Sequence, residues 1–299
     1  MKRLLLLLTF LPALLFAQNA GEAGFSFLKI GFGARNISLG DLGVVGINDV
    51  SAVNYNPAVV NDLNNTQIII GHNSYIQDMN SEIMGASFRM FGLPFAITVN
   101  TTSINDIEIH SGPWQGEGTF NANYFFTGIS TGFELNENIS TGITVKYLYE
   151  NLFSDESGGY GFDIGLRYSN VIKNLNLGAS LRNLGSVNEL RNKVTKLPVD
   201  FRIGASYSFN LKTVNSELLL LSGFQKYTAV DNSHIHVGAE FLYNNLISIR
   251  AGYITGYEAK DLTAGFGINW NLFNFDYAFS NFTYNLGSAH TISVMYTFQ

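Results

Sequence analysis

The chain has no cysteine among its 299 residues, and only 13% of them are charged. Without cysteine there are no disulfides, no thiol catalysis and no cysteine-based metal sites. The net charge is −6 and no basic block occurs, so we do not expect nucleic acid binding. Only five prolines are present, and no low-complexity run suggests a linker. We therefore expect a single domain.

Long hydrophobic runs are also absent after the first 17 residues. Lys2 and Arg3 precede an apolar stretch from Leu4 to Leu15, and Ala17 is a suitable residue before a cleavage site. This pattern is typical of a secretory signal peptide covering 1–17. The stretch is shorter than the ~20 apolar residues of a membrane-spanning helix. We predict an exported protein whose membrane spans, if any, are built from strands.

A repeated alternation of apolar and polar residues is present instead. It extends from about residue 66 to Gln299, and aromatic residues and glycines are frequent. Leu262, Ala264 and Phe266, for example, alternate with Thr263 and Gly265. A period of two predicts β-strands, and strands of about ten residues with one apolar face are typical of barrels in outer membranes.

The pattern predicts an all-β fold, a fourteen-stranded antiparallel transmembrane β-barrel over 66–299. Fourteen is even, as closure of an antiparallel barrel requires. The predicted strands are 66–73, 81–91, 93–101, 122–134, 138–149, 159–169, 174–184, 198–209, 215–225, 234–243, 246–255, 260–269, 272–280 and 288–298.

Short and long connections are predicted to alternate between these strands. The even-numbered strands are followed by short turns, and the largest of the other connections lie around 102–121, 150–158, 185–197 and 226–233. Outer-membrane barrels have short periplasmic turns and longer outer loops. We therefore expect an outer-membrane protein of a two-membraned (Gram-negative) bacterium, with both termini and the segment 18–65 on the periplasmic side.

The polar face of the strands is predicted to line the lumen and carries most of the charge. The charged residues on this face are Arg89, Lys146, Asp163, Arg167, Arg182, Arg202, Glu240, Arg250 and Asp276. They fit a structural lattice of salt bridges that fills the lumen. A role in selectivity or substrate contact remains the alternative, because lumen charges tune selectivity in open barrels.

Catalytic and metal-binding motifs are not found. His234 and His236 share a strand face and could hold a metal, but a pair lining the lumen is the simpler interpretation. No zinc-protease, nucleophile-elbow or P-loop motif is present. We predict no enzyme activity, no metal site and no cofactor.

The segment 18–65 does not alternate and is predicted to be a hatch inside the barrel. Its glycines, among them Gly31, Gly33, Gly40 and Gly43, permit a compact path. The sequence Asn56-Pro57-Ala58 reads as a tight turn. Proline fixes its own φ and forces the preceding asparagine into an extended conformation. Plugging the lumen is one role for this block, and gating or ligand contact is the other.

Residues 27–58 also carry a resemblance. The stretches 27–35, 38–43 and 49–58, which ends in Asn-Tyr-Asn-Pro-Ala, closely resemble the N-terminus of the PorV/PorQ family. More distantly, they resemble the hatch of FadL-type transporters. Leu197-Pro198 and several strand motifs, such as 250–253, agree with the family.

The resemblance implies a fourteen-stranded FadL-like barrel with an N-terminal plug. It also implies a component of, or accessory to, type IX protein secretion. The barrel would then be a membrane anchor and docking platform in outer-membrane lipid, with other secretion proteins or secreted cargo as partners. The alternative is FadL-like transport of a hydrophobic small molecule across the outer membrane.

Overall fold

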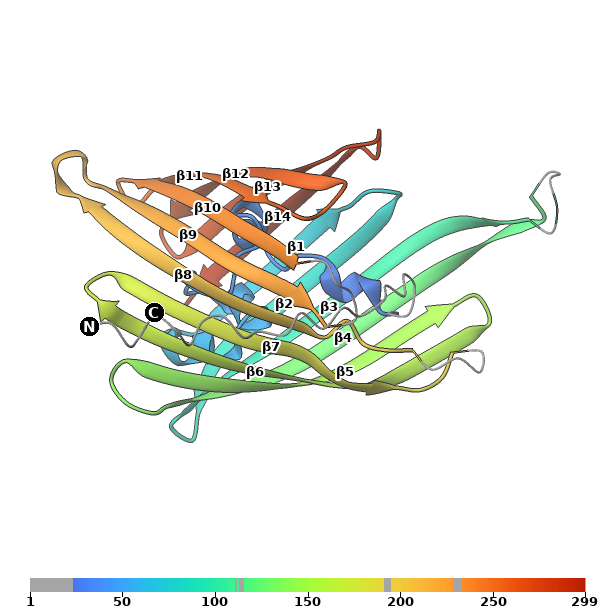
Figure 1. Cartoon of the computed structure of the whole chain (residues 1–299), viewed down its shortest axis with the longest axis horizontal. Coiled ribbons are helices and arrows are strands. Elements are labelled where there is room, and N and C mark those ends of the chain that lie inside the picture. Colours follow the sequence, from blue (N-terminus) through green and yellow to red (C-terminus); the bar gives the residue numbers. More distant parts are fainter. Residues whose placement is uncertain (1–23, 111, 113–115, 191–194, 229–232, 299) are drawn as a thin grey trace, which may run out of the picture.

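The structure, a computed structural model, describes residues 24–110, 112, 116–190, 195–228 and 233–298. It is a closed antiparallel barrel of fourteen strands, each paired with its neighbours in chain order (Figure 1). The predicted fold is thus confirmed. The predicted signal peptide and its cleavage site lie outside the described residues. No helix in the described part of the chain is long and apolar enough to span a membrane.

The observed strands match the predicted ones in number and order. Their bounds are β1 Gln67–Ser74, β2 Met79–Met90, β3 Leu93–Ile109, β4 Gly118–Glu134, β5 Ile139–Leu152, β6 Asp155–Ile172, β7 Leu175–Val187, β8 Asp200–Leu211, β9 Ser216–Tyr227, β10 Ser233–Tyr243, β11 Ile247–Ile254, β12 Lys260–Trp270, β13 Phe273–Phe282 and β14 Ser288–Thr297. Most boundaries differ from the prediction by no more than four residues, but β3 ends eight residues later than predicted, at Ile109.

The first and last strands close the barrel. β1 pairs with β14 over eight residues, from Gln67 opposite Thr297 to Ser74 opposite His290. Along each strand, side chains alternate between a buried inner face and an exposed, largely apolar outer face, as on β11. Ile249, for example, is 64% exposed. A continuous apolar exterior on a sheet without edges is the surface of a transmembrane barrel.

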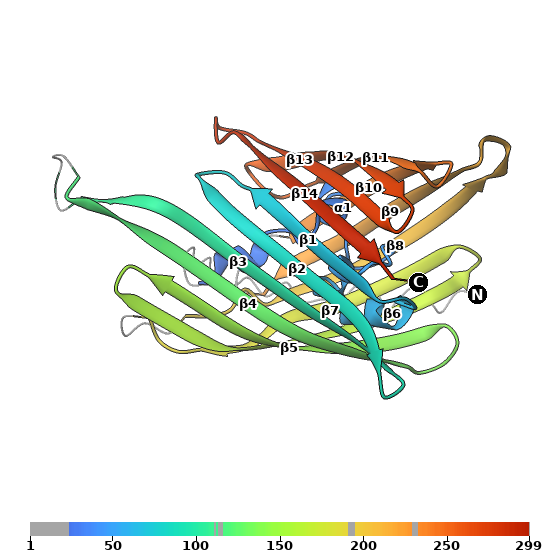
Figure 2. The same cartoon turned by 180° about the vertical axis from the view of Figure 1, so that it is seen from behind.

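The two ends of the barrel differ in their connections. The short-turn end holds the turns that follow β2, β4, β6, β8, β10 and β12. Asn244 and Asn245, with φ of 52° and 54°, form a tight turn there. The long-loop end holds the other connections and includes the tall β3–β4 hairpin (Figure 2).

The prediction of long loops is wrong at two places. Residues 150–158 form no loop, because β5 and β6 stay paired up to Leu152 opposite Asp155. Most of 102–121 is likewise strand, with Ile109 opposite Gly118. Polar and glycine residues here resemble loop sequence, but continued backbone pairing with the neighbouring strand holds them in the sheet.

The hatch comprises the described residues 24–66 and lies inside the barrel. It contains four short helices: η1 Ser26–Lys29, α1 Ala34–Ser38, η2 Val50–Asn54 and η3 Pro57–Asp62. Most of its residues are buried, and Leu39, Val45, Ile47 and Val50 are fully so. The segment begins next to Thr195 in the β7–β8 loop, at the long-loop end, and reaches the short-turn end at η3. The hatch therefore runs through the lumen, whereas the prediction placed all of it on one side.

The inner wall meets the hatch through glycines. Gly178, Gly204 and Gly223 lie side by side on β7, β8 and β9, and the hatch segment 42–45 packs against them. Gly238 on β10 faces the carbonyl of Leu39 in the same way. A Cβ at any of these positions would approach a hatch atom to within 3.0 Å. The hatch therefore packs directly against the backbone of the wall strands. Only glycine permits so close an approach.

Replacing another wall glycine that contacts the hatch, Gly165, should loosen the hatch. A Cβ at Gly165 on β6 would overlap Asn56 and Pro57, whereas one at Gly161 on the same strand face would make ordinary contacts. We expect Gly165→Ala to destabilise the protein by about 1–3 kcal/mol, because overpacking a buried contact costs that much. Gly161→Ala is the matched control and should cost well below 1 kcal/mol. The measurement is urea unfolding in detergent. Equal midpoints for the two variants would contradict the close contact.

Candidate functional site

The predicted Asn-Pro-Ala motif joins the hatch to the wall. The side chain of Asn56 accepts a hydrogen bond from the backbone N–H of Ala58 at 3.0 Å and so caps η3, which begins at Pro57. Its amide nitrogen donates to the carbonyl of Val44 at 2.9 Å and to that of Leu166 on β6 at 3.1 Å. One asparagine therefore ties together two parts of the hatch and the barrel.

The predicted hatch glycines all lie at close approaches. Gly31 and Gly43 leave room for the side chain of Tyr55, and Gly40 lies against the backbone of β10 and β11. Gly33 and Gly40 also have φ of 83° and 75°, which residues with a side chain rarely adopt.

Tyr55 lies at the centre of a buried charged cluster. Its hydroxyl donates to Asp41 at 2.5 Å and accepts from the backbone N–H of Phe32 at 2.7 Å. Burial, with Asp41 alongside, holds the pKa of Tyr55 well above its usual value. The hydroxyl therefore stays protonated and remains a donor. The guanidinium groups of Arg182 and Arg202 lie 5.5 and 5.2 Å from the centre of the Tyr55 ring.

The two arginines of this cluster share one carboxylate. Arg182 donates twice to Asp200, at 2.8 Å each, and Arg202 donates to the same carboxylate at 2.9 Å. Arg202 also reaches the carboxylate of Asp41 at 3.6 Å. The network thus extends from β7 and β8 to the hatch.

A second cluster joins α1 of the hatch to the wall at β10, β11 and β13. Arg35 pairs with Glu240 on β10 at 2.7 Å and lies 3.6 Å from Asp49. Arg250 on β11 contacts the same glutamate and pairs with Asp276 on β13 at 2.6 Å. Three strands and two hatch residues are therefore connected through one glutamate.

The other predicted lumen residues form smaller contacts. Lys146 pairs with Asp163 at 2.6 Å, and both are buried in the wall of β5 and β6. Arg167 contacts Asp62 of the hatch and donates to Asn48 at 2.8 Å. Arg89 differs from the rest, because it is exposed at the short-turn end and its one contact among the described residues is a long hydrogen bond of 3.5 Å to a hatch carbonyl.

These contacts favour the structural interpretation of the lumen charges. Buried ions are tolerated when opposite charges and hydrogen bonds surround them. Sequence reasoning missed the hatch partners Arg35, Asp41 and Asp49, and also Asp200. The position of Asp200, two residues before Arg202 on the same strand face, was a usable signal. The hatch residues gave no such signal. Their sequence does not alternate, so it does not show which way each side chain points.

The two strand histidines contact the hatch and the β11–β12 connection. The ring of His234 stacks on Tyr257 at 3.7 Å, and Nδ1 of His236 lies 2.6 Å from the carbonyl oxygen of Gly40. No group of three or more metal-ligating side chains occurs in the part of the chain that the structure describes.

The mouth pocket is the cavity at the long-loop end between the hatch and the rim of the barrel. Its volume is about 420 Å³. Most of its lining is apolar, with Phe27 and Ile30 from the hatch and Ile254 and Phe282 from the wall among its residues. An apolar cavity with a few polar groups is the usual form of a small-molecule site.

Two lysines also line the mouth pocket. Lys29 comes from η1 of the hatch, and Lys260 from the start of β12. Neither forms an ion pair with any described residue, whereas the carboxylate of Asp41, also in the lining, is shared with Tyr55 and Arg202. Burial lowers the pKa of Lys29. Glu258 also lines the pocket, so two carboxylates accompany the two lysines, but no ion pair joins either lysine to a described residue.

A smaller pocket of about 200 Å³ lies on the other side of the hatch. Its lining is mostly polar and includes Arg35, Asn48, Arg167 and Glu217. The two pockets share no lining residue, and buried hatch residues lie between them. The cavity at the long-loop end is therefore mostly apolar, the smaller one is mostly polar, and the hatch separates them.

The fold is similar to that of solved hydrocarbon channels. The Pseudomonas putida toluene transporter TodX aligns with a TM-score of 0.64 at 12% identity, covering 89% of this chain and 98% of its own. CymD, a monoaromatic hydrocarbon channel, aligns with a TM-score of 0.63 at 13% identity over 90% of this chain and 98% of its own. A Pseudomonas aeruginosa FadL homologue aligns with a TM-score of 0.55 at 11% identity over 90% and 100%.

At these identities the similarity shows the fold alone. The resemblance to FadL-like barrels is confirmed at that level, whereas the finer resemblance to the PorV/PorQ family stays a prediction. No protein-family model matches the chain, and no curated protein matches it in sequence.

Glu240, which two arginines share, should contribute far more to the free energy of unfolding than an exposed ion pair does. Glu240→Gln removes the charge that faces Arg35 and Arg250, and breaking a buried pair of this kind costs about 3–5 kcal/mol. Glu82→Gln is the matched control, because Glu82 pairs only with His72 on the exposed outer face. An exposed pair contributes about 0–1 kcal/mol. Urea unfolding in detergent compares the two, and similar losses would contradict a structural role for the lumen cluster.

Proposed function

We propose that the protein is an outer-membrane carrier for a small, largely apolar molecule with an anionic group. The observation that carries this proposal is the mouth pocket, which combines an apolar lining with Lys29 and Lys260. An apolar body would bury its surface against Phe27 and Phe282. A carboxylate or similar group would supply the missing partner for the lysines.

We infer the cellular location of the protein from its predicted signal peptide and from the apolar outer face of the barrel. A predicted signal peptide indicates export, and a transmembrane β-barrel made after export belongs in the outer membrane of a Gram-negative bacterium. We assign the short-turn end to the periplasm and the long-loop end to the outside. With this orientation, the mouth pocket faces the medium and is the first cavity that an incoming molecule meets.

Structural neighbours support transport as the class of function. TodX is a toluene transporter, and CymD is a monoaromatic hydrocarbon channel. A neutral hydrocarbon needs no charged partner, so the two lysines distinguish the pocket proposed here. An anion beside Lys29 would stabilise its protonated form and offset the effect of burial on its pKa. Affinity for the anion should therefore fall as rising pH deprotonates the lysine.

Passive diffusion through the lumen is a weaker explanation. The hatch occupies the lumen and is tied to the wall by ion pairs through Arg35, Asp41 and Asp62. The base beyond the hatch is polar. Free passage of solutes would require the hatch to be displaced, so we expect uptake to be selective.

A docking role in type IX secretion is the second candidate. The closed, ion-paired hatch supports it, because an anchor needs a stable barrel and no open path. Secretion proteins or secreted cargo would then be the partners. In that case the mouth pocket would have no ligand of its own, and filling it would leave protein export unchanged.

Removing the two lysines should abolish the preference for an anionic ligand. We expect Lys29→Gln with Lys260→Gln to weaken octanoate binding about tenfold or more, because a hydrogen bond to a charged group contributes about 1.5–3 kcal/mol. Binding of 1-octanol, which has the same chain without the charge, should stay unchanged. The measurement is isothermal titration of the purified protein in detergent.

Lys173→Gln is the control, since Lys173 lies exposed in the turn after β6 at the short-turn end. Equal affinity of the wild-type protein for octanoate and 1-octanol would contradict the anionic preference. Absence of binding for both would contradict the pocket itself.

A measurement of protein export distinguishes a carrier from a docking component of type IX secretion. If the barrel is a carrier, a deletion strain should secrete surface proteins at the wild-type level and should lose uptake of the ligand. Quantitative proteomics of the cell surface measures the first, and uptake of labelled octanoate the second. Loss of surface proteins, restored equally by wild-type protein and by the double lysine variant, would instead establish the docking role.

A further inference from the structure

A lysine, an aspartate and an asparagine meet on the inner face of three neighbouring strands. This wall triad consists of Lys146 on β5, Asp163 on β6 and Asn183 on β7, and none of the three is more than 2% exposed. The ammonium of Lys146 lies 2.6 Å from Asp163 and donates to the side-chain oxygen of Asn183 at 3.1 Å. The stem of Lys146 crosses β6 at Gly161, which lies directly opposite and has no side chain to obstruct it. An amine, a carboxylate and a carboxamide are therefore in contact inside the wall.

A bulge in β7 brings the asparagine to the triad. The pairing of β6 with β7 shifts its register beside Asp163, so that Arg182 and Asn183 lie opposite this one residue and are both buried. Asn183 has a φ of 59°, a left-handed conformation that asparagine adopts more readily than most residues. A bulge of this kind redirects a side chain. With regular alternation, Asn183 would point outward, away from Lys146.

Two hydrogen bonds fix the direction of the Asn183 amide. Its nitrogen donates to the carbonyl of Pro198 at 3.1 Å, and its oxygen accepts from Lys146. A carbonyl only accepts and an ammonium only donates, so a flipped amide would lose both bonds. The backbone N–H of Asn183 donates to Asp163 at 2.8 Å and keeps the carboxylate beside the same residue. The amide therefore presents its carbonyl group to the amine and its nitrogen to the other side.

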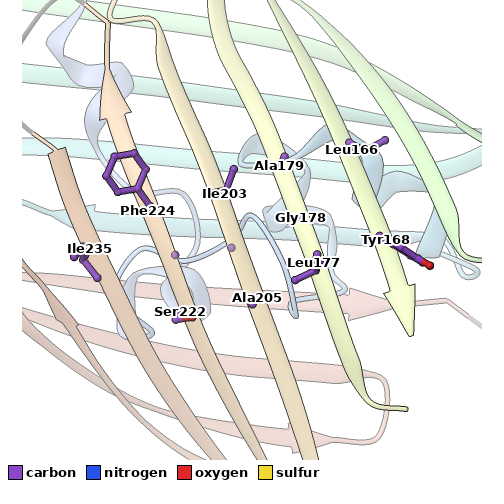
Figure 3. Close-up of a pocket in the computed structure, with 12 residues that line it drawn as sticks. Leu166, Tyr168, Leu177, Gly178, Ala179, Ile203, Ala205, Ser222, Phe224 and Ile235 are labelled. Carbon is purple, nitrogen blue, oxygen red and sulfur yellow. The ribbon is translucent and has the colours of Figure 1, made fainter. Parts of the chain in front are cut away.

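The surroundings of the wall triad are apolar on both sides of the wall. Inside, Leu148 and Phe126 are buried, and the ammonium of Lys146 lies 5.5 Å from the centre of the Phe126 ring. Outside, β6 and β7 carry apolar side chains, among them Leu166 and Ala179 (Figure 3). A charged amine is costly in such surroundings. Transfer of its proton to Asp163 leaves a neutral amine, which is the nucleophilic form.

We propose that Lys146 and Asn183 become joined by an isopeptide bond, which the chain forms by itself after folding. Asp163 takes a proton from the ammonium, and the neutral Nζ of Lys146 then attacks Cγ of Asn183. The bond between Cγ and Nδ2 breaks while Asp163 gives its proton to Nδ2 and takes a second proton from Nζ. The ammonia that leaves carries this second proton away as ammonium ion. The lysine ammonium and the primary amide thus become a secondary amide and an ammonium ion, and the carboxylate is regenerated.

The bond would tie β5 to β7 across β6. It joins residues 37 positions apart and closes the intervening chain into a covalent loop. A crosslink of this kind restricts the unfolded chain in the way a disulfide does, in a sequence that has no cysteine. The reaction takes place once in each chain, lies outside the mouth pocket and does not depend on the proposed transport.

Peptide mapping of the wild-type protein tests the bond directly. The full chain is purified from outer membranes, denatured, digested with trypsin and examined by mass spectrometry. We expect trypsin to leave the chain uncut after Lys146, and the lysine to carry the fragment that begins at Asn183, directly after Arg182. This branched peptide should be lighter than the sum of its two parts by the mass of one ammonia. A wild-type protein with an unlinked Lys146 would overturn the proposal.

The position of the branch must be read from the fragments. Cyclisation of Gln18, the predicted first residue after the signal peptide, would also remove one ammonia and change the intact mass equally. A link from Lys146 to Asp163 would remove water in place of ammonia, and finding it would overturn the assignment of Asn183. The covalent loop should also survive boiling in SDS, so the wild-type chain should migrate differently from an unlinked variant in a denaturing gel.

Variants separate the residue that is linked from the residue that catalyses. Asn183→Gly removes the amide and still permits the positive φ, so it should abolish the branched peptide. Asn174→Gly is the matched control and should retain it, because Asn174 also has a positive φ, of 67°, but lies in the turn before β7. Loss of the branch in both variants, or in neither, would contradict the site.

The role of Asp163 is measured as a rate. Wild-type protein is refolded from urea into detergent, and we expect release of one ammonium ion per chain together with formation of the branched peptide. Asp163→Asn should slow both at least tenfold, because general acid–base catalysis contributes about 10²–10⁴-fold. Linkage at the wild-type rate in this variant would overturn the catalytic role. Heat-dependent gel mobility shows whether each variant has folded, and the peptide map of the wild-type protein tests the bond whether or not the variants fold.

Discussion

The structure depends on close contact between the hatch backbone and the inner wall of the barrel. Fourteen strands enclose more space than their own inward side chains fill. The hatch fills it only because the wall presents glycines where the two chains meet, as at Gly238 against Leu39 and Gly252 against Gly40. The wall glycines therefore determine where the hatch lies. The other contacts in the lumen depend on that position.

Charged side chains hold this arrangement together. The wall and the hatch each bring ions that would be costly to bury alone. Asp200 needs Arg182 and Arg202, Arg202 also meets Asp41, and Glu240 joins Arg35 to the wall. The two pairs between hatch and wall, Arg202 with Asp41 and Arg35 with Glu240, connect residues 161 and 205 positions apart in the chain. The barrel and the hatch are thus stabilised by each other, and the hatch is part of the core.

The strands could be predicted because alternation is a local property. Each strand shows its two faces in its own sequence, so their number, order and inward charges followed without knowledge of partners. The ends of β5 and β6 could not be predicted, because Asp155 is held in a strand by pairing with Leu152 and not by its own preference. The partners of Arg35 were equally out of reach, since one sequence does not reveal contacts over such distances. Asn56 was recognised as a turn residue, but its bond to the carbonyl of Leu166 appeared only in the structure.

The two halves of the hatch are held by different forces, and this bears on how a ligand could pass. From α1 onward, the hatch is tied to the wall by ion pairs at Arg35, Asp41 and Asp62. The part before α1 meets the wall mainly through aromatic packing, with Phe27 stacked on Tyr124 at 5.3 Å, and makes no ion pair among the described residues. That part also forms one side of the mouth pocket. Aromatic contacts give way with less loss than buried ion pairs, because no unpaired charge remains behind. The ligand proposed for the mouth pocket would therefore touch the part of the hatch that can move at the lower cost.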